Sequence, residues 1–467
     1  MRAITDMLRH AQGLQEAGRL AEAARVYETI LSQEPRHFDA LLLLALLRLK
    51  TGEAAVAERL LTDAGMVNPA SADVWSLRAN ALQQQGRISD ALSSLDKAVA
   101  LNPHSAVLWS NRGNLLLTMG RGAEAVEHYD RALAADGGFA DAWYNRGIAL
   151  LTAGNHREAE ASLNRALALN PGHAEALEHR GIALAAQGRH EDALQSFDAA
   201  LAHGSHADLL LARGDCLLQL DRCREAVADY DRVAALAPPG NAQALLNRGV
   251  ALSRLGQHGE ALESYDRALR ILPESAESWH NRGSALLAFS DRAGALSSYD
   301  KALTIRPDYA EAWKSRGVLL LLLQAYDDAL ISFDRALSLN PRDGPTLYNR
   351  ASVYSLLARF EDCARDCEAL LALDPDYPYA RGLLLDARLY CCDWQGLDEA
   401  RGLIRAEIAA EKRVISPFRF LAISTSPEEQ LQCARILVRD SYPAAEAALW
   451  RGERYGHDKI RLAYLSA

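Results

Sequence analysis

Residues 240–273 read GNAQALLNRGVALSRLGQHGEALESYDRALRILP, and this 34-residue stretch decides the fold because similar copies of it run along most of the chain. A proline ends nearly every copy, and only two copies have Gly137 or Ser205 in its place. These prolines are Pro35, Pro69, Pro103, Pro171, Pro239, Pro273, Pro307, Pro341 and Pro375. A repeat of this length is typical of arrays in which each copy is one small structural unit. The sequence therefore predicts eleven repeats over residues 4–375.

Three further positions indicate what each copy folds into. A glycine near the middle, an alanine five residues later and an aromatic residue four residues after the alanine return in most copies, as Gly256, Ala261 and Tyr265 do here. The glycine allows the left-handed backbone that ends a first helix, and the alanine lets a second helix approach closely. Tryptophans of the first helix fill the space between the two helices. They are Trp75, Trp109, Trp143, Trp279 and Trp313.

Each copy is therefore expected to be a pair of helices of about 13 residues, a length that is marginal in isolation. Stacking on neighbouring copies must supply the missing stability. The pattern is that of tetratricopeptide repeats, which implies an all-α, right-handed superhelix (solenoid) with a concave face open to a ligand.

The period is irregular in one region. Arg180 and Arg213 are 33 residues apart, Arg213 and Arg248 are 35 apart, and the turn at 238–241 is longer than in other copies. We favour neutral drift within a tolerant array, and a hinge between two halves of the superhelix is the alternative.

Most first helices carry the string Asn-Arg-Gly or a relative of it. The asparagines of this string, Asn111, Asn145, Asn247, Asn281 and Asn349, are the predicted peptide-binding residues. A side-chain amide offers donors and an acceptor, so a row of them can hold the backbone of an extended peptide whatever its side chains are. Solvated residues, or residues bonded to their own helix, are the alternative. Replacing Asn247 and Asn281 with alanine is expected to weaken peptide binding without unfolding.

The arginine of the same string stands where the repeat consensus has leucine. An aspartate follows the aromatic residue of most second helices, at Asp130, Asp198, Asp231, Asp266, Asp300 and Asp334. A recurring Arg and a recurring Asp at a fixed offset predict ion pairs between helices, with the arginine stem packed against the core.

No catalytic, cofactor-binding or metal-ligating residues are predicted in this chain. Cys363 and Cys367 are four residues apart, but they occupy the columns that hold alanine and an aromatic residue elsewhere. Packing in the core is therefore favoured over a metal site.

Composition and charge limit the classes of binding partner and the cellular compartment that are expected. The 467 residues carry 51 Lys+Arg against 61 Asp+Glu, a formal charge of -10, with basic residues spread along the chain. Nucleic acids and membranes are therefore not expected as partners. Proteins or peptides in the concave groove are expected, and the formation of a homodimer is left open. The longest apolar run, Leu41 to Leu47, is too short to span a bilayer. Seven irregularly spaced cysteines fit a reducing compartment, so a cytoplasmic location is expected.

The 34-residue period ends after Pro375. Residues 376–415 are predicted to form a capping helix pair, with Asp393 at the start of its second helix, and 416–458 a helical linker that begins a helix at Ser426-Pro427. Residues 459–467 alternate with strand period, and a single strand indicates the start of a further domain.

The C-terminal residues also carry a resemblance to a known family. Cys392-Asp393-Trp394, Pro417-Phe418 and the string YGHDKIRLAYLS at 455–466 follow the repeat array. In this order they resemble the bacterial protein O-linked N-acetylglucosamine transferases, glycosyltransferase family 41.

This resemblance implies a parent enzyme that transfers a sugar from a UDP-sugar donor to proteins, with the asparagine row holding the substrate backbone. Its catalytic and UDP-binding residues are expected beyond Ala467, so this chain is expected to be inactive alone. His179, Ala212 and Ser315 interrupt the row, which favours two shorter clusters. A free-standing scaffold or adaptor that assembles protein complexes is the competing hypothesis.

Overall fold

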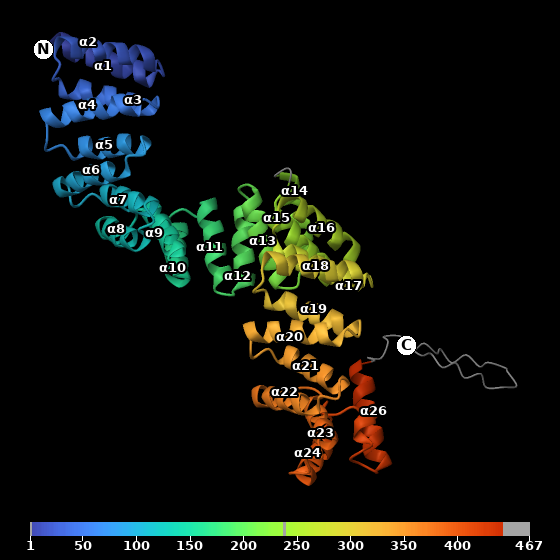
Figure 1. The fold of residues 1–467 in the computed structure, drawn as a ribbon. Coiled ribbons are helices and arrows are strands. Elements are labelled where there is room, and N and C mark those ends of the chain that lie inside the picture. The colour runs from blue at the N-terminus through green and yellow to red at the C-terminus, as the bar shows by residue number, and fades with distance from the viewer. Residues whose placement is uncertain (1, 237–239, 442–467) are drawn as a thin grey trace, which may run out of the picture. The chain divides into compact units, whose positions relative to one another are not determined.

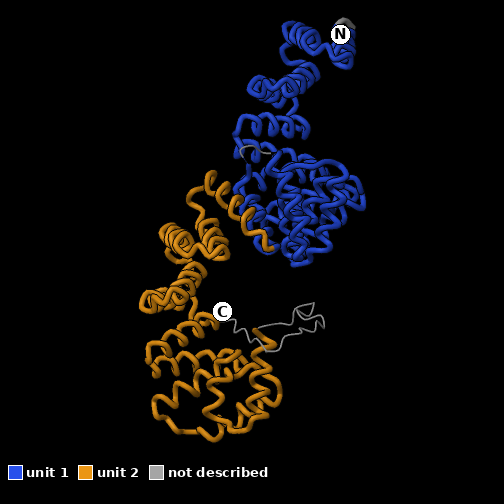
Figure 2. Tube along the Cα trace, turned by 90° about the vertical axis from the view of Figure 1, so that its right-hand side faces the viewer, with its two compact units in different colours: residues 1–255 blue, residues 256–467 orange. Residues whose placement is uncertain are grey.

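The computed structural model describes residues 2–236 and 240–441. Within these ranges all regular structure is helical, with 26 helices (Figure 1). The chain divides into two compact units, residues 1–255 (unit 1) and 256–467 (unit 2), which Figure 2 shows in different colours.

From α1 to α14 in unit 1 each first helix is followed by its second helix, and consecutive helices of the unit pack against one another. The helices are α1 (Arg2–Glu16), α2 (Leu20–Gln33), α3 (Phe38–Lys50), α4 (Ala54–Val67), α5 (Ala72–Gln84), α6 (Ile88–Leu101), α7 (Ala106–Thr118), α8 (Gly122–Ala135), α9 (Ala140–Thr152), α10 (His156–Leu169), α11 (Ala174–Ala186), α12 (His190–Leu201), α13 (Ala207–Gln219), α14 (Cys223–Leu236) and α15 (Ala242–Arg254).

In unit 2 the helices up to α22 have lengths similar to those of unit 1, and the later ones vary. They are α16 (His258–Ile271), α17 (Ala276–Ala288), α18 (Arg292–Ile305), α19 (Ala310–Leu322), α20 (Tyr326–Leu339), α21 (Gly344–Leu356), α22 (Phe360–Leu373), α23 (Ala380–Tyr390), α24 (Leu397–Ala409), α25 (Pro417–Phe420) and α26 (Pro427–Ser441). The prediction of an all-α solenoid of helix pairs is confirmed within each unit.

The turn between the first and second helix of each copy has the left-handed backbone that the glycine column predicted. Gly52 has φ 81° and Gly120 has φ 73°. Where the column holds another residue the conformation is kept, with φ 57° at Asp221 and 56° at Ala358. The stacking of the pair therefore sets this turn, and a residue with a Cβ accepts the strain.

A second glycine, in the middle of the first helix, lets the second helix lie against it. In α19 a Cβ added to Gly317 would be 2.6 Å from Cε1 of Phe333, a residue of α20 with no exposed surface. Several copies with alanine at this place have a smaller residue opposite: Ala79 is paired with Leu95 and Ala351 with Cys367. The residues at the crossing are thus matched in size in most copies. The exceptions are Gly147, which faces Leu163, and Ala11, which is paired with Tyr27.

The predicted ion pairs between helices are confirmed. They join Arg112 to Asp96, Arg146 to Asp130, Arg213 to Asp198, Arg248 to Asp231, Arg282 to Asp266, Arg316 to Asp300 and Arg350 to Asp334, at 2.6 to 2.8 Å.

The same arginine also binds the second helix of its own copy. Nη1 of Arg316 donates to Oγ of the buried Ser332 at 2.7 Å, whereas Arg350 binds the buried Asp366 instead. One guanidinium therefore ties together two successive second helices.

The helices after the last repeat pack into a small core of their own. Ile404 and Ile408 of α24 are buried with Phe420 of α25 and Cys433 of α26. The prediction that Asp393 caps α24 is wrong, because the residue before the helix is Gly396, with φ 65°. The Asp393 side chain instead accepts a hydrogen bond from the backbone of Gln395, at 3.1 Å, within the turn itself.

Three other predictions concern single segments. Cys363 and Cys367 are fully buried in the core, as expected from their columns. Among the described helices, none is both long and apolar enough to cross a membrane. The predicted strand at 459–467 and residues 442–458 of the predicted linker lie outside the described residues.

Candidate functional site

The five predicted asparagines lie at one position of five first helices, and all are half-buried. Asn111, Asn145 and Asn247 belong to α7, α9 and α15 of unit 1, whereas Asn281 and Asn349 belong to α17 and α21 of unit 2. The structure brings Asn111 and Asn145 to neighbouring first helices, and the others are separated from them by copies that lack the asparagine.

A second polar position, three residues further along the same helices, connects the row to the core. Oδ1 of Asn114 accepts hydrogen bonds from the hydroxyl of the buried Tyr129 at 2.7 Å and from Nδ2 of Asn145 at 3.1 Å. Because both lone pairs of this oxygen are used, the two N–H groups of Asn114 are left for other partners. The side-chain amide oxygen of Asn145 and one of its N–H groups also remain for other partners.

The same arrangement recurs between α13 and α15 with a carboxylate. Oδ1 of Asp215 accepts from Tyr230 at 2.8 Å and from Nδ2 of Asn247 at 2.7 Å. Burial raises the pKa of the Asp215 carboxyl, and the two hydrogen bonds oppose this effect. Gln243 donates to Asn247 from its own helix at 3.0 Å. Asn247 therefore has a structural role, and its replacement by alanine is expected to loosen α13 against α15.

In unit 2 the corresponding face carries a histidine. Nε2 of His280 lies 3.0 Å from Oγ of Ser315, and the hydroxyls of Ser284 and Tyr299 are 3.2 Å apart. Burial lowers the pKa of His280, so its ring is neutral at physiological pH. This part of the face is polar and mainly uncharged.

The second polar position was not recognised in the sequence, although a signal for it exists. Asn114, Asp215 and Ser284 each bind the hydroxyl of the tyrosine in their own copy, 15 residues later. Where that residue is Phe197 or Phe333, the position holds Ile182 or Val318. A buried hydroxyl requires a partner and a phenyl ring does not, which explains the residues in these copies. The correlation does not extend to every tyrosine, because Val250 lies 15 residues before Tyr265.

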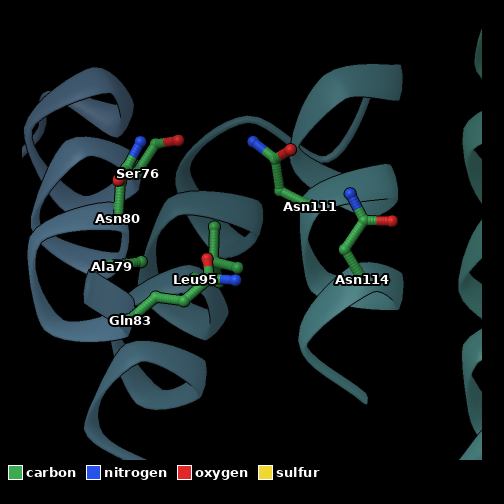
Figure 3. Close-up of a pocket in the computed structure, with 7 residues that line it drawn as sticks. All are labelled: Ser76, Ala79, Asn80, Gln83, Leu95, Asn111 and Asn114. Carbon is green, nitrogen blue, oxygen red and sulfur yellow. The ribbon is translucent and has the colours of Figure 1, made fainter. Parts of the chain in front are cut away.

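The amide side chains of unit 1 surround a recess between α5 and α7. Its volume is about 110 Å³, and it is lined by Ser76, Ala79, Asn80, Gln83, Leu95, Asn111 and Asn114. In Figure 3, Asn111 and Asn114 of α7 stand opposite Ser76 and Asn80 of α5, with Leu95 of α6 between the two helices.

The chemistry available on this face is hydrogen bonding, mainly by neutral amides and hydroxyls, with the Asp215 carboxylate among them. Among the described residues, no cluster of three or more His, Cys, Asp or Glu side chains is arranged to hold a metal ion. Side-chain amides can pair with the N–H and C=O groups of a polypeptide and need no charge on it.

Comparison with models of known protein families finds matches along most of the chain. Models described as "Tetratricopeptide repeat" match the chain over residues 76–140, 110–172, 144–208, 211–276 and 280–344, and a second such model matches residues 14–81.

Among solved structures, a crystal structure of MamA protein is 22% identical, with a TM-score of 0.34, over 35% of this chain and 90% of that one. Another crystal structure of MamA is 24% identical, with a TM-score of 0.32, over 33% of this chain and 91% of that one. No curated protein sequence matches the chain.

Proposed function

The chain belongs to the tetratricopeptide-repeat family, and on that premise we propose that it is a protein-binding scaffold that holds extended polypeptides along its first helices. The observation that carries the proposal is the pair Asn114 and Asn145. Their mutual hydrogen bond fixes the orientation of the amide groups, so that donors of one copy and an acceptor of the next remain available.

The spacing of the copies suits an extended chain. Packed helices lie roughly 8–10 Å apart, and an extended chain advances about 3.3 Å per residue. About three residues of a bound peptide would therefore correspond to each step between adjacent first helices. Backbone groups recur at every residue, which makes such binding tolerant of sequence.

A finer proposal is that this scaffold recruits the protein substrates of a UDP-sugar-dependent protein glycosyltransferase. Its support is the resemblance at residues 392–394, 417–418 and 455–466. The intact mass of the protein made by its own cells tests it, together with a UDP-sugar transfer assay on that product. A mass well above 51.0 kDa with transfer activity is expected. A mass equal to it, without transfer, would leave a free-standing adaptor as the function.

Asn111→Leu tests the scaffold proposal itself. Leucine occupies the same position in the preceding copy, at Leu77, so the fold should accept it. Losing the amide is expected to weaken peptide binding by roughly 5- to 10-fold, because each lost hydrogen bond costs about 1 kcal/mol. Fluorescence anisotropy with labelled peptides selected from a random library measures the change.

The matched control is Asn340→Leu, which makes the same chemical change at the exposed end of α20. Its affinity should equal that of the unmodified chain. If Asn111→Leu binds every selected peptide as tightly as the control does, the asparagine row does not hold peptides.

A further inference from the structure

We infer that the recess between α5 and α7 is a pocket for the side-chain carboxamide of a glutamine or asparagine in the bound polypeptide. The inference rests on the proposed function. It adds a preference for one peptide side chain to a binding mode that otherwise contacts only the peptide backbone.

The core of this copy leaves room for the recess. Leu95 stands where the next copy has Tyr129, whose hydroxyl reaches Asn114 at 2.7 Å. The smaller side chain accompanies Ala79, which replaces the glycine found at Gly113 in that next copy. Leucine has no ring to extend toward Asn80, and the space stays open as the recess.

The polar lining offers both donors and acceptors. The side-chain oxygen of Asn80 already accepts a hydrogen bond from Gln84 at 3.0 Å, and that of Asn114 accepts two, so both residues turn amide nitrogen toward other partners. Asn111 and Gln83 supply further amide groups. A carboxamide is complementary to such a lining because it both donates and accepts.

Charged and apolar side chains are poorly matched to the recess. None of the lining residues is charged, so a carboxylate or ammonium group would be desolvated there without a counter-ion. Ala79 and Leu95 are the only apolar residues of the lining, so an aliphatic or aromatic side chain would cover polar groups with which it cannot form hydrogen bonds.

The matched test closes the recess with a combination that the fold already uses. Ala79→Gly with Leu95→Tyr reproduces the Gly113 and Tyr129 pair, and the new ring would occupy the recess. Ala45→Gly with Leu61→Tyr makes the same exchange two helices earlier, away from the recess, and serves as the control. Should the first variant fail to fold, Asn80→Ile replaces it, because Ile148 and Ile182 occupy that position in other copies.

The experiment selects peptides from a random displayed library against the full chain and each variant. Enrichment of Gln or Asn at one peptide position is expected for the unmodified chain and the control, and its loss is expected when the recess is closed. For a selected peptide, Gln→Glu and Gln→Met should each weaken binding to the unmodified chain at least tenfold, and to the closed variant less than twofold.

Three outcomes would overturn the inference. Peptide binders without enrichment of Gln or Asn would exclude the pocket and leave the proposed function standing. Equal enrichment on the closed variant would show that the recess does not read the carboxamide. A library that yields no binders at all would reject both the pocket and the proposed function.

Discussion

Arg350→Met is expected to lower the free energy of unfolding of unit 2 by about 3–5 kcal/mol, because it leaves a buried carboxylate without its partner. Nε and Nη2 of Arg350 donate to the two oxygens of Asp366 at 2.8 and 2.7 Å, and Nη1 donates to Asp334 at 2.7 Å. Asp366 is only 5% exposed, so water cannot replace the guanidinium.

Residues at the same position in other copies indicate a control variant and a second substitution that should restore stability. Arg316 binds a serine, Ser332, at the corresponding place, so Arg316→Met leaves no buried charge and should cost about 1 kcal/mol. Adding Asp366→Ser to Arg350→Met should recover most of the stability.

Arrays of repeats open locally, so hydrogen exchange of α21 and α22 is measured alongside chemical denaturation. Equal losses for the variants at Arg350 and Arg316 would contradict a role for the buried carboxylate.

Gly317→Ala is expected to destabilise unit 2 by about 2 kcal/mol, although alanine favours helices more than glycine does. The added Cβ would lie 2.6 and 2.7 Å from two ring atoms of Phe333, whose side chain is fully buried. The midpoint of chemical denaturation measures the loss.

Phe333→Leu added to Gly317→Ala should restore most of the lost stability, because the pair Ala79 and Leu95 occurs at the same place in another copy. Gly402 in α24 is the control, since an added Cβ there meets nothing within 4 Å. Gly402→Ala should be neutral or stabilising. If both alanine variants behave alike, the close approach of Phe333 does not matter for stability.

The fold was predictable because every copy repeats the residues that form it. The turn glycine, the crossing glycine or alanine and the Arg–Asp pairs recur, and the structure places them as the pattern indicates. The start of α24 was not predictable in this way. Residues there follow no repeat, and Gly396 rather than Asp393 precedes the helix.

The candidate site was only partly predictable, since it depends on differences between copies. The asparagine column was visible, but its link to buried tyrosines through Asn114 and Asp215 required the structure. The recess was even harder to predict from the sequence. It depends on Leu95 being smaller than the aromatic residues of other copies. The sequence alone does not distinguish such a substitution from neutral variation.

The central claim is that polypeptides bind along the first helices, and hydrogen–deuterium exchange with and without a saturating selected peptide tests it most directly. We expect slower exchange in α5, α7 and α9, where the amide side chains lie, and unchanged exchange in the second helices α6, α8 and α10. Slowing confined to the second helices would contradict the claim, because the peptide would then bind a face without the amide row.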